Sequence, residues 1–142
     1  MSTLLSALEA GKSALNAERV RIEAAVSNLA NAESTRGPDG QPYRRRDVVL
    51  EEQAVDFDTA LGKAGTSVGV RVAGVVEDQT PFQRVFQPSH PDADADGYVA
   101  LPNVDEAEEM VNMLGAARAY QANLTAISLV RDLIQRALDI GK

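Results

Sequence analysis

One group of potential metal ligands is a short acidic repeat from Asp92 to Gly97, in which Asp and Ala alternate. Alternating carboxylates followed by a glycine are typical of the first half of an EF-hand loop, whose oxygen ligands surround a calcium ion. That loop needs a bidentate Glu at its twelfth position, where this chain has Asn103, and Pro88 and Pro91 exclude a regular entering helix. The pattern therefore favours an acidic surface turn, and we expect no bound metal.

His90 is the only histidine, so a catalytic triad with a His base would have to be built on it. Asp92 and Asp94 are close enough in sequence to pair with it, but the chain has no recognisable nucleophile motif or oxyanion loop. The absence of Cys excludes thiolate nucleophiles and Cys-ligated zinc. A hydrogen-bonded loop histidine is the favoured interpretation and a hydrolase using His90 the weaker alternative, so we assign no catalytic residue and no cofactor.

Basic residues gather in one run, Arg44 to Arg46, in a chain whose formal net charge is −7. Consecutive residues of a strand alternate between its faces, so such a run places only one or two guanidinium groups on each side. A nucleic-acid-binding surface needs a clustered excess of Lys and Arg. We therefore expect no nucleic-acid partner and no small-molecule substrate, and we expect these arginines to lie at a solvated edge or to pair with acidic neighbours in an assembly.

The first element that must position these groups is a long N-terminal helix over residues 2–33. This segment contains no proline, and Leu8, Leu15, Ile22 and Leu29 recur every seven residues, which predicts one apolar stripe. A helix of this length spans about 48 Å, more than the rest of a small globule could cover. Charged residues flank the stripe, so its apolar seam is too thin to stabilise the helix alone. Part of this long helix must therefore meet another chain or stay disordered.

The middle of the chain, residues 34–102, predicts a β-rich insertion with loops. A segment rich in Gly and Pro ends the first helix, and β-forming residues then dominate 43–52 and 68–77. Residues 83–86 and 98–101 are shorter strand candidates. We expect three aromatic side chains to form the core of this insertion: Phe57, Phe82 and Phe86.

A second long helix is predicted over residues 103–141. Asn103 and Glu106 fit a capping box at its start, acidic residues at 105–109 match the positive end of the helix dipole, and Gly141 fits a stop. Two apolar rows with a repeat of seven follow. The first row is Met113, Tyr120, Ile127 and Ile134, and the second is Met110, Ala117, Leu124 and Leu138.

These elements predict an α+β fold, mainly α with a small β insertion. Two terminal helices joined by a compact middle pair most simply as an antiparallel coiled-coil hairpin, and small residues such as Gly11 and Gly115 would allow close approach. Charges interrupt the first 21 residues, so we expect no cleavable signal peptide, and no apolar run is long enough to span a bilayer. If the chain works outside the cytosol, another export route must carry it.

Four blocks of sequence, in order along most of the chain, resemble the flagellar rod and hook protein family. Residues 27–32, Ser-Asn-Leu-Ala-Asn-Ala, are similar to its N-terminal signature, and 109–114 with 118–123 are similar to its C-terminal signature. Residues 42–45 and segments within 90–104 resemble the proximal-rod members of the family. A lone Asn-Leu-Ala-Asn tetrapeptide would be weak evidence, but four ordered blocks are specific.

This resemblance implies a structural subunit of the basal-body rod, not an enzyme, that is exported unfolded through the type III apparatus and assembled in the periplasm. Its terminal helices would pack around the export channel with other rod and axial proteins and with copies of itself, above the membrane-embedded ring and export apparatus, to form the drive shaft required for motility. A cytosolic acidic type III secretion chaperone is the alternative. The predicted assembly interface is Leu8, Leu15, Ile22, Asn28, Leu29, Asn31, Met110, Met113, Tyr120, Asn123, Leu124, Ile127, Ile134 and Leu138.

Overall fold

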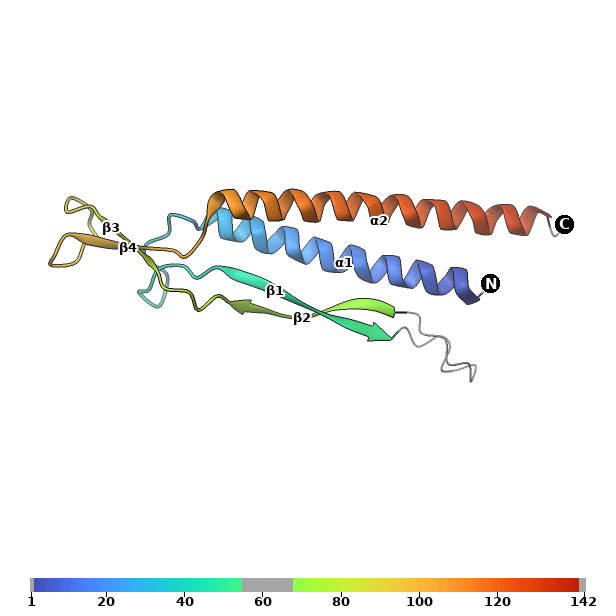
Figure 1. The fold of residues 1–142 in the computed structure, drawn as a ribbon, viewed down its shortest axis with the longest axis horizontal. Coiled ribbons are helices and arrows are strands. Elements are labelled where there is room, and N and C mark those ends of the chain that lie inside the picture. Colours follow the sequence, from blue (N-terminus) through green and yellow to red (C-terminus); the bar gives the residue numbers. More distant parts are fainter. Residues whose placement is uncertain (1, 55–67, 141–142) are drawn as a thin grey trace.

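The computed structural model describes residues 2–54 and 68–140 and shows an elongated molecule (Figure 1). Helix α1 covers Ser2–Ala30 and helix α2 covers Glu106–Ile140. The strands between them form two antiparallel pairs, β1 with β2 and β3 with β4: β1 Arg46–Ala54, β2 Val68–Glu77, β3 Gln83–Phe86 and β4 Tyr98–Leu101. The predicted α+β class, with two long terminal helices and a small β insertion, is confirmed.

The two helices lie side by side and run in opposite directions, so the start of α1 and the end of α2 lie at the same end of the molecule (Figure 1). With 35 residues, α2 is about 52 Å long. Among the described helices and strands, α2 touches only α1, so its covered side faces α1. That side contains the predicted row from Met113 to Ile134, which is half-buried. It also contains a second row that was not among the two predicted rows: Glu109, Ala116, Asn123 and Val130.

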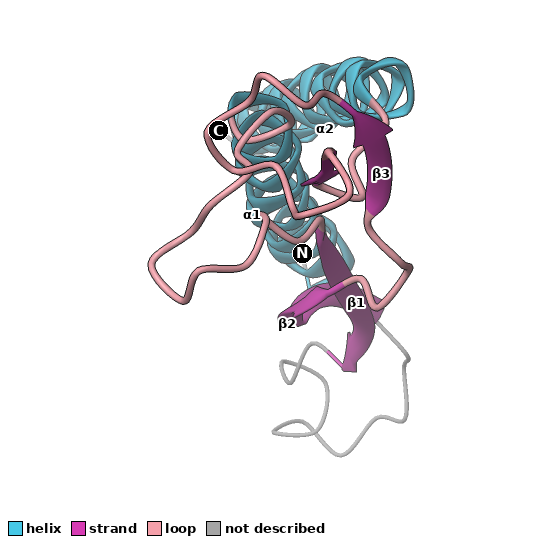
Figure 2. Ribbon diagram, turned by 90° about the vertical axis from the view of Figure 1, so that its left-hand side faces the viewer, coloured by secondary structure: helices cyan, strands magenta, loops and turns pink. Residues whose placement is uncertain are grey.

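The ribbon formed by β1 and β2 covers the other side of α1, so α2, α1 and the ribbon form three successive layers (Figure 2). Arg46 pairs with Glu77 at one end of the ribbon, and the register shifts between Val49 and Leu50. The Ser13 hydroxyl of α1 accepts a hydrogen bond from the backbone N–H of Val70 at 3.1 Å, which fastens β2 to the helix. As a result, α1 is packed on two sides and α2 on one.

The hairpin of β3 and β4 extends beyond the helices at the end opposite the termini (Figure 1). The prediction that Phe86 belongs to a core is wrong, because it is 60% exposed and its ring lies against Gly97 and packs edge-to-face with Tyr98 at the surface of the hairpin. Phe82 is half-buried beneath the guanidinium of Arg44, and Phe57 lies outside the described residues. A two-stranded hairpin has no second layer that could cover a large aromatic face. The buried hydrophobic residues in this region are instead Val99 of β4 and Val104 in the segment after it.

Three predicted strand ranges, 68–77, 83–86 and 98–101, are confirmed, but two boundaries next to the first turn were wrong. The first helix ends at Ala30 and not near residue 33, and β1 begins at Arg46 and not at residue 43. The residues between α1 and β1 form a loop that a backbone hydrogen bond closes, in which the N–H of Tyr43 donates to the carbonyl of Ser34 at 3.1 Å. These residues therefore extend neither the helix nor the strand. The predicted stop at Gly141 lies outside the described residues.

The helices approach each other closely at Gly11, where an added Cβ would lie 2.8 Å from Cγ1 of Ile127. Gly11→Val is therefore expected to lower the free energy of unfolding by about 1–3 kcal/mol through overpacking. Gly115→Ala is the matched control, because nothing lies within 4 Å of an added Cβ there and the higher helix propensity of Ala adds up to about 1 kcal/mol. Urea unfolding followed by circular dichroism measures both; equal effects would contradict a close approach at Gly11.

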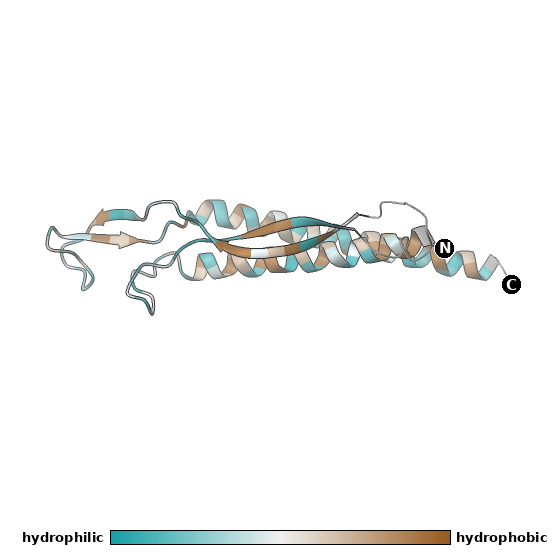
Figure 3. Ribbon diagram, turned by 90° about the horizontal axis from the view of Figure 1, so that it is seen from below, coloured by the Kyte–Doolittle hydropathy of each residue, from teal (hydrophilic) through white to brown (hydrophobic). Residues whose placement is uncertain are grey.

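The described part of the chain buries few side chains. Its buried hydrophobic residues are Ala17, Ala25, Val99, Val104 and Ala116. The accessible surface is 9741 Å², whereas a compact monomer of 15.2 kDa has about 7100 Å². Figure 3 shows apolar segments along both helices and along the ribbon of β1 and β2. Within 2–54 and 68–140, no helix has the length and apolarity needed to cross a membrane.

Candidate functional site

Asn28, in the last turn of α1, joins three parts of the fold. Its side chain is 1% exposed and its amide fills every hydrogen-bonding position. The Oδ1 atom accepts from the backbone N–H of Arg46 and from the hydroxyl of Tyr43, both at 2.9 Å. The Nδ2 atom donates to the carbonyl of Arg46 and to Oε2 of Glu109, also at 2.9 Å. This one amide therefore holds the end of α1 against the start of β1 and the first turn of α2.

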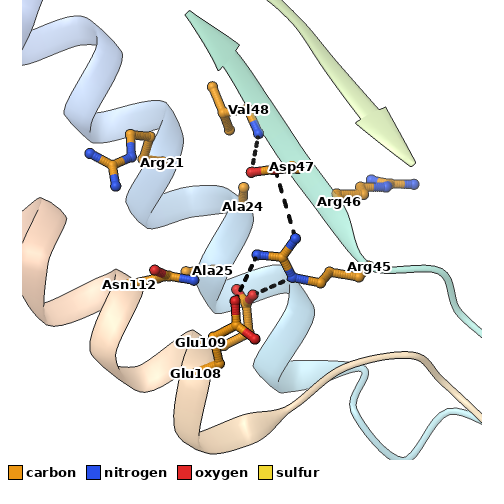
Figure 4. Close-up of a pocket in the computed structure, with 10 residues that line it drawn as sticks. All are labelled: Arg21, Ala24, Ala25, Arg45, Arg46, Asp47, Val48, Glu108, Glu109 and Asn112. Carbon is orange, nitrogen blue, oxygen red and sulfur yellow. Dashed lines mark hydrogen bonds and ion pairs between the residues drawn. The ribbon is translucent and has the colours of Figure 1, made fainter. Parts of the chain in front are cut away.

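Glu109 is the largest fully buried side chain in the described residues, and Arg45 neutralises it. The Nε of Arg45 donates to Oε1 of Glu109 at 2.6 Å, and Figure 4 shows the Arg45 side chain reaching from the segment before β1 to α2. Burial is the largest influence on the pKa of Arg45 and lowers it, but the hydrogen bond and charge of Glu109, with Asp47 and Glu108, raise the pKa above its ordinary value overall. The pair is therefore an ionised contact in the interior.

Asn103 extends this network to β2. Its Oδ1 accepts from the backbone N–H of Arg45 at 2.9 Å, and its Nδ2 donates to the carbonyls of Asp78 and Thr80 at 3.1 and 3.3 Å. Hydrogen bonds from the Thr80 side chain and backbone lower the pKa of Asp78, which lies 3.7 Å from Arg45. We call this network of Asn28, Arg45, Asn103 and Glu109 the junction. It ties the end of α1, the first turn of α2, the start of β1 and the residues directly after β2 together.

Asn103 does not cap α2, contrary to the sequence-based prediction, because its side chain is used in the junction. Asp105 is the cap: its Oδ1 accepts from the backbone N–H groups of Ala107 and Glu108 at 2.9 and 3.1 Å. The acidic first turn expected from the helix dipole is confirmed, with Glu106, Glu108 and Glu109 in place.

Removing the cap with Asp105→Ala is expected to lower the free energy of unfolding by about 1 kcal/mol, because two N–H groups of α2 lose their acceptor. Glu106→Ala is the control, since no hydrogen bond ties its carboxylate to the first turn in the described residues. Urea titrations of the two variants test the assignment, and a larger loss for Glu106→Ala would refute it.

Asn31 ends α1. Its Nδ2 donates to the carbonyl of Ser27 at 2.8 Å and its Oδ1 accepts from the hydroxyl of Ser34 at 3.2 Å. Both asparagines of the 27–32 block therefore act inside the chain, one at the junction and one at the helix end. Their assignment to an interface between subunits stays a prediction.

Comparison with known proteins matches the two terminal segments of the chain to two families of flagellar rod proteins. The family described as "Flagella basal body rod protein" matches residues 8–38, and the one described as "Flagellar basal body rod FlgEFG protein C-terminal" matches residues 95–140. The chain is 45% identical to "Flagellar basal-body rod protein FlgC" of Salmonella typhimurium over 139 residues, with 98% of each chain covered. The chain belongs to the FlgC family of flagellar basal-body rod proteins. Its relatives of the same name in Bacillus subtilis and Aquifex aeolicus are 40% and 34% identical, with at least 99% of each chain covered.

Membership of the FlgC family makes the chain a structural subunit of the flagellar rod, located in the basal body and required for motility. Assembly with other rod and axial proteins follows from the same membership. The alternative of a cytosolic secretion chaperone is not supported, because the relatives are named as rod proteins.

In this FlgC-family chain, the predicted interface residues other than Asn28 and Asn31 fall into two groups. Leu8, Leu15, Ile22 and Leu29 of α1, with the Met113 row and Asn123 of α2, are half-buried within the layers of the fold. The second predicted row of α2 is turned away from α1 and stays open: Met110 is 51% exposed, Leu124 37% and Leu138 49%. The structure thus brings the first group together and leaves the second available to a neighbour.

The acidic repeat forms a turn at the tip of the β3–β4 hairpin. Oδ1 of Asp94 accepts from the N–H groups of Tyr98 and Asp96 at 2.8 and 3.0 Å, and Arg84 pairs with the other oxygen. The hydrogen bond from Tyr98 contributes most to lowering the pKa of Asp94. Gly97 has the positive φ of 81° that the turn requires. These contacts confirm the interpretation as a structural turn.

His90 and Asp92 also hold loops together. The Nδ1 atom of His90 accepts from the N–H of Asp92 at 3.1 Å, as expected for a hydrogen-bonded loop histidine. The Asp92 carboxylate accepts from the hydroxyl of Thr35 at 2.8 Å and lies 3.3 Å from Arg36. In the part of the chain that the structure describes, no group of three or more His, Cys, Asp or Glu side chains is arranged to hold a metal.

Proposed function

We propose that this rod subunit completes its fold only in the polymer, where α1 and α2 pack against the terminal helices of neighbouring axial proteins. The observation that supports this is the exposed row of α2, formed by Met110, Leu124 and Leu138, on a helix that one neighbouring element covers on one side. Burial of each leucine-sized side chain contributes about 2 kcal/mol. A few such contacts decide whether the outer turns of α2 stay helical.

The spacing on the inner side of α2 supports a coiled-coil arrangement of the two helices. The covered positions from Glu109 to Ile134 include a series with alternating steps of four and three residues, and the two further covered positions, Asn112 and Ala119, lie directly beside members of that series. A repeat of seven with this alternation keeps a seam on the partner when two helices wind around each other with a left-handed twist. Open rows beside such a seam would extend the same packing from one subunit to the next.

Contacts between subunits of a growing shaft are heterologous, because a self-complementary patch closes into a dimer. We infer that the interface combines the open row of α2 with the stripes of α1, and that Asn28 and Asn31 support it by fixing the helix ends. The full proposed set is Leu8, Leu15, Ile22, Asn28, Leu29, Asn31, Met110, Met113, Tyr120, Asn123, Leu124, Ile127, Ile134 and Leu138.

The remaining parts of the proposal concern the route and the place of assembly. The subunit passes unfolded through the type III export apparatus without a cleavable signal peptide and joins a periplasmic tube around the export channel, above the membrane-embedded ring. The terminal segments 2–33 and 103–141 form the shaft, and 34–102 form a separate insertion. Helices that depend on neighbours for stability suit passage through a narrow channel. No enzymatic step, small-molecule substrate or nucleic acid is part of this role.

Cell fractionation combined with amide hydrogen exchange tests this function. The chain is expected to copurify with basal bodies, and the outer turns of its terminal helices, far from Asn28 and Glu109, are expected to exchange rapidly in the dilute lone subunit and slowly in basal bodies. A chain that stays in the cytosol would support a chaperone. Helices fully protected in the lone subunit would contradict folding on assembly.

A further inference from the structure

We propose that a groove beside the end of α1 binds the acidic first turn of α2 of an adjacent copy of this chain. This inference rests on the proposed rod function and names one contact within the assembly. The groove has a volume of about 630 Å³. Its lining comes from the loop after α1, from Arg46 at the start of β1 and from Glu77 at the end of β2.

Arginines give the groove its character. Arg36, Arg44 and Arg46 line it together with two carboxylates, those of Asp39 and Glu77. Asp39 is engaged in its own turn, where Oδ1 accepts from the N–H of Gln41 at 3.1 Å. The formal net charge of the chain is −7. A groove lined by more arginines than carboxylates is therefore unusual on its surface and favours an anionic partner.

The charges of these arginines are only partly neutralised within the subunit. Arg44 is the most engaged of them, since its Nη1 donates to the carbonyl of Asp78 at 3.2 Å and its charge contributes to lowering the pKa of Asp78. The guanidinium of Arg46 lies 5.7 Å from the centre of the Tyr43 ring, and that of Arg44 lies 4.3 Å from the centre of the Phe82 ring. Within the described residues, neither Arg44 nor Arg46 forms an ion pair with a carboxylate. Arg36 pairs with Asp92, but its side chain is 70% exposed, so it remains accessible to a second carboxylate. Aromatic faces orient a cation without removing its charge, so an incoming carboxylate would still be attracted.

The acidic first turn of α2 has the matching chemistry. Asp105, Glu106 and Glu108 are exposed, and their charges at this end of the helix are already favoured by its dipole. Within residues 2–54 and 68–140, Glu106 takes part in no ion pair, and Glu108 approaches Arg45 only at the 4.0 Å limit. The turn therefore offers carboxylates that the subunit itself leaves largely unpaired.

The position of the two surfaces favours a second copy as the occupant. The start of α2 and the loop between α1 and β1 lie at nearly the same level along the long axis (Figure 1). Copies placed side by side with little shift along that axis would bring the turn of one copy to the groove of the next. Because the two surfaces differ, the contact is heterologous and continues from copy to copy around a shaft. Opposite charges at its rim would also make assembly sensitive to salt.

Charge reversal tests the pairing in cells whose only copy of this protein is the variant. Arg46→Glu and Glu106→Arg are each expected to lower incorporation into basal bodies by about tenfold, because like charges would face each other. The double variant restores the attraction and is expected to recover incorporation to within about twofold of the parent. Arg118→Glu is the matched control on an exposed part of α2 and should change incorporation little. Normal incorporation of both single variants, or a double variant no better than the singles, would overturn the inference.

Cross-linking separates contacts between chains from contacts within one chain. The sequence has no Cys, so Arg36→Cys with Glu106→Cys gives a protein whose only thiols flank the proposed contact. A short bis-maleimide is expected to join such chains into covalent dimers and larger ladders in basal bodies. Cross-links confined to single chains would refute a contact between copies. If these variants behave like the parent while Leu124→Asp is excluded from basal bodies, this inference fails and the proposed function stands.

Discussion

Arg45→Ala is expected to lower the free energy of unfolding by about 3–5 kcal/mol, because it leaves the carboxylate of Glu109 buried without a cation. Glu109 is 2% exposed, and its hydrogen bond to Nε of Arg45 is 2.6 Å long. The other hydrogen bond at that carboxylate comes from the neutral amide of Asn28, which cannot replace a positive charge. Urea unfolding of the purified chain measures the loss.

Two further variants separate loss of the charge pair from loss of the side chain. Arg46→Ala removes a neighbouring guanidinium that is exposed, so we expect a change within about 0.5 kcal/mol. Replacing both Arg45 and Glu109 with Met removes the pair without leaving a buried charge, so most of the stability should return. If Arg45→Ala were as mild as Arg46→Ala, the junction would not be the main link between the helices and the ribbon.

Leu124→Asp is expected to abolish incorporation into basal bodies and swimming while leaving the lone subunit folded as before. The side chain is already 37% exposed in the lone subunit, so the substitution costs little there. In the polymer it would remove about 2 kcal/mol of apolar burial per contact, a factor of roughly 30, and it would also place a charge in an apolar interface. Leu15→Asp, at the half-buried stripe of α1, is also expected to abolish assembly, but part of its effect comes from lost packing within the subunit.

The control for this experiment is Leu124→Met, which keeps an apolar side chain of similar volume and should preserve swimming. Circular dichroism of each purified variant checks that the subunit retains the helix content of the parent, and swarm plates and basal-body preparations measure assembly. Cells that swim normally with Leu124→Asp would contradict a role for the open row of α2 between subunits.

The long-range order of this fold could be predicted from the sequence because it depends on repeats. The interval of seven between Met113 and Ile134 identified a covered row of α2, and alternation of valines in 68–77 identified β2. The division of roles within the junction could not be predicted in this way. Asn103 and Asp105 are both good caps, and the choice between them depends on the backbone of Arg45, which lies 58 residues away from Asn103.

The buried ion pair was missed for a related reason. Arg44, Arg45 and Arg46 are equivalent in sequence, and only the three-dimensional position of Glu109 selects Arg45 to turn inward. A useful signal was present, since Asn28, Arg45 and Glu109 all lie in the sequence blocks that resemble the flagellar rod and hook protein family. The prediction of an aromatic core containing Phe86 was wrong because the strands near Phe86 form a hairpin with one layer. Composition does not reveal how many layers a group of strands forms.

The start of α1 and the end of α2 lie together, with the junction at the far end of the helix pair, so the direction of a mechanical load matters. A force that draws the two free ends apart peels the helices open one turn at a time and meets the Arg45 and Glu109 pair last. A force along the length of the pair loads every turn at once, as in a lap joint under shear. The subunit is therefore expected to be compliant to peeling and stiff lengthwise, a combination that suits the proposed passage through a narrow export channel and the proposed place in the shaft.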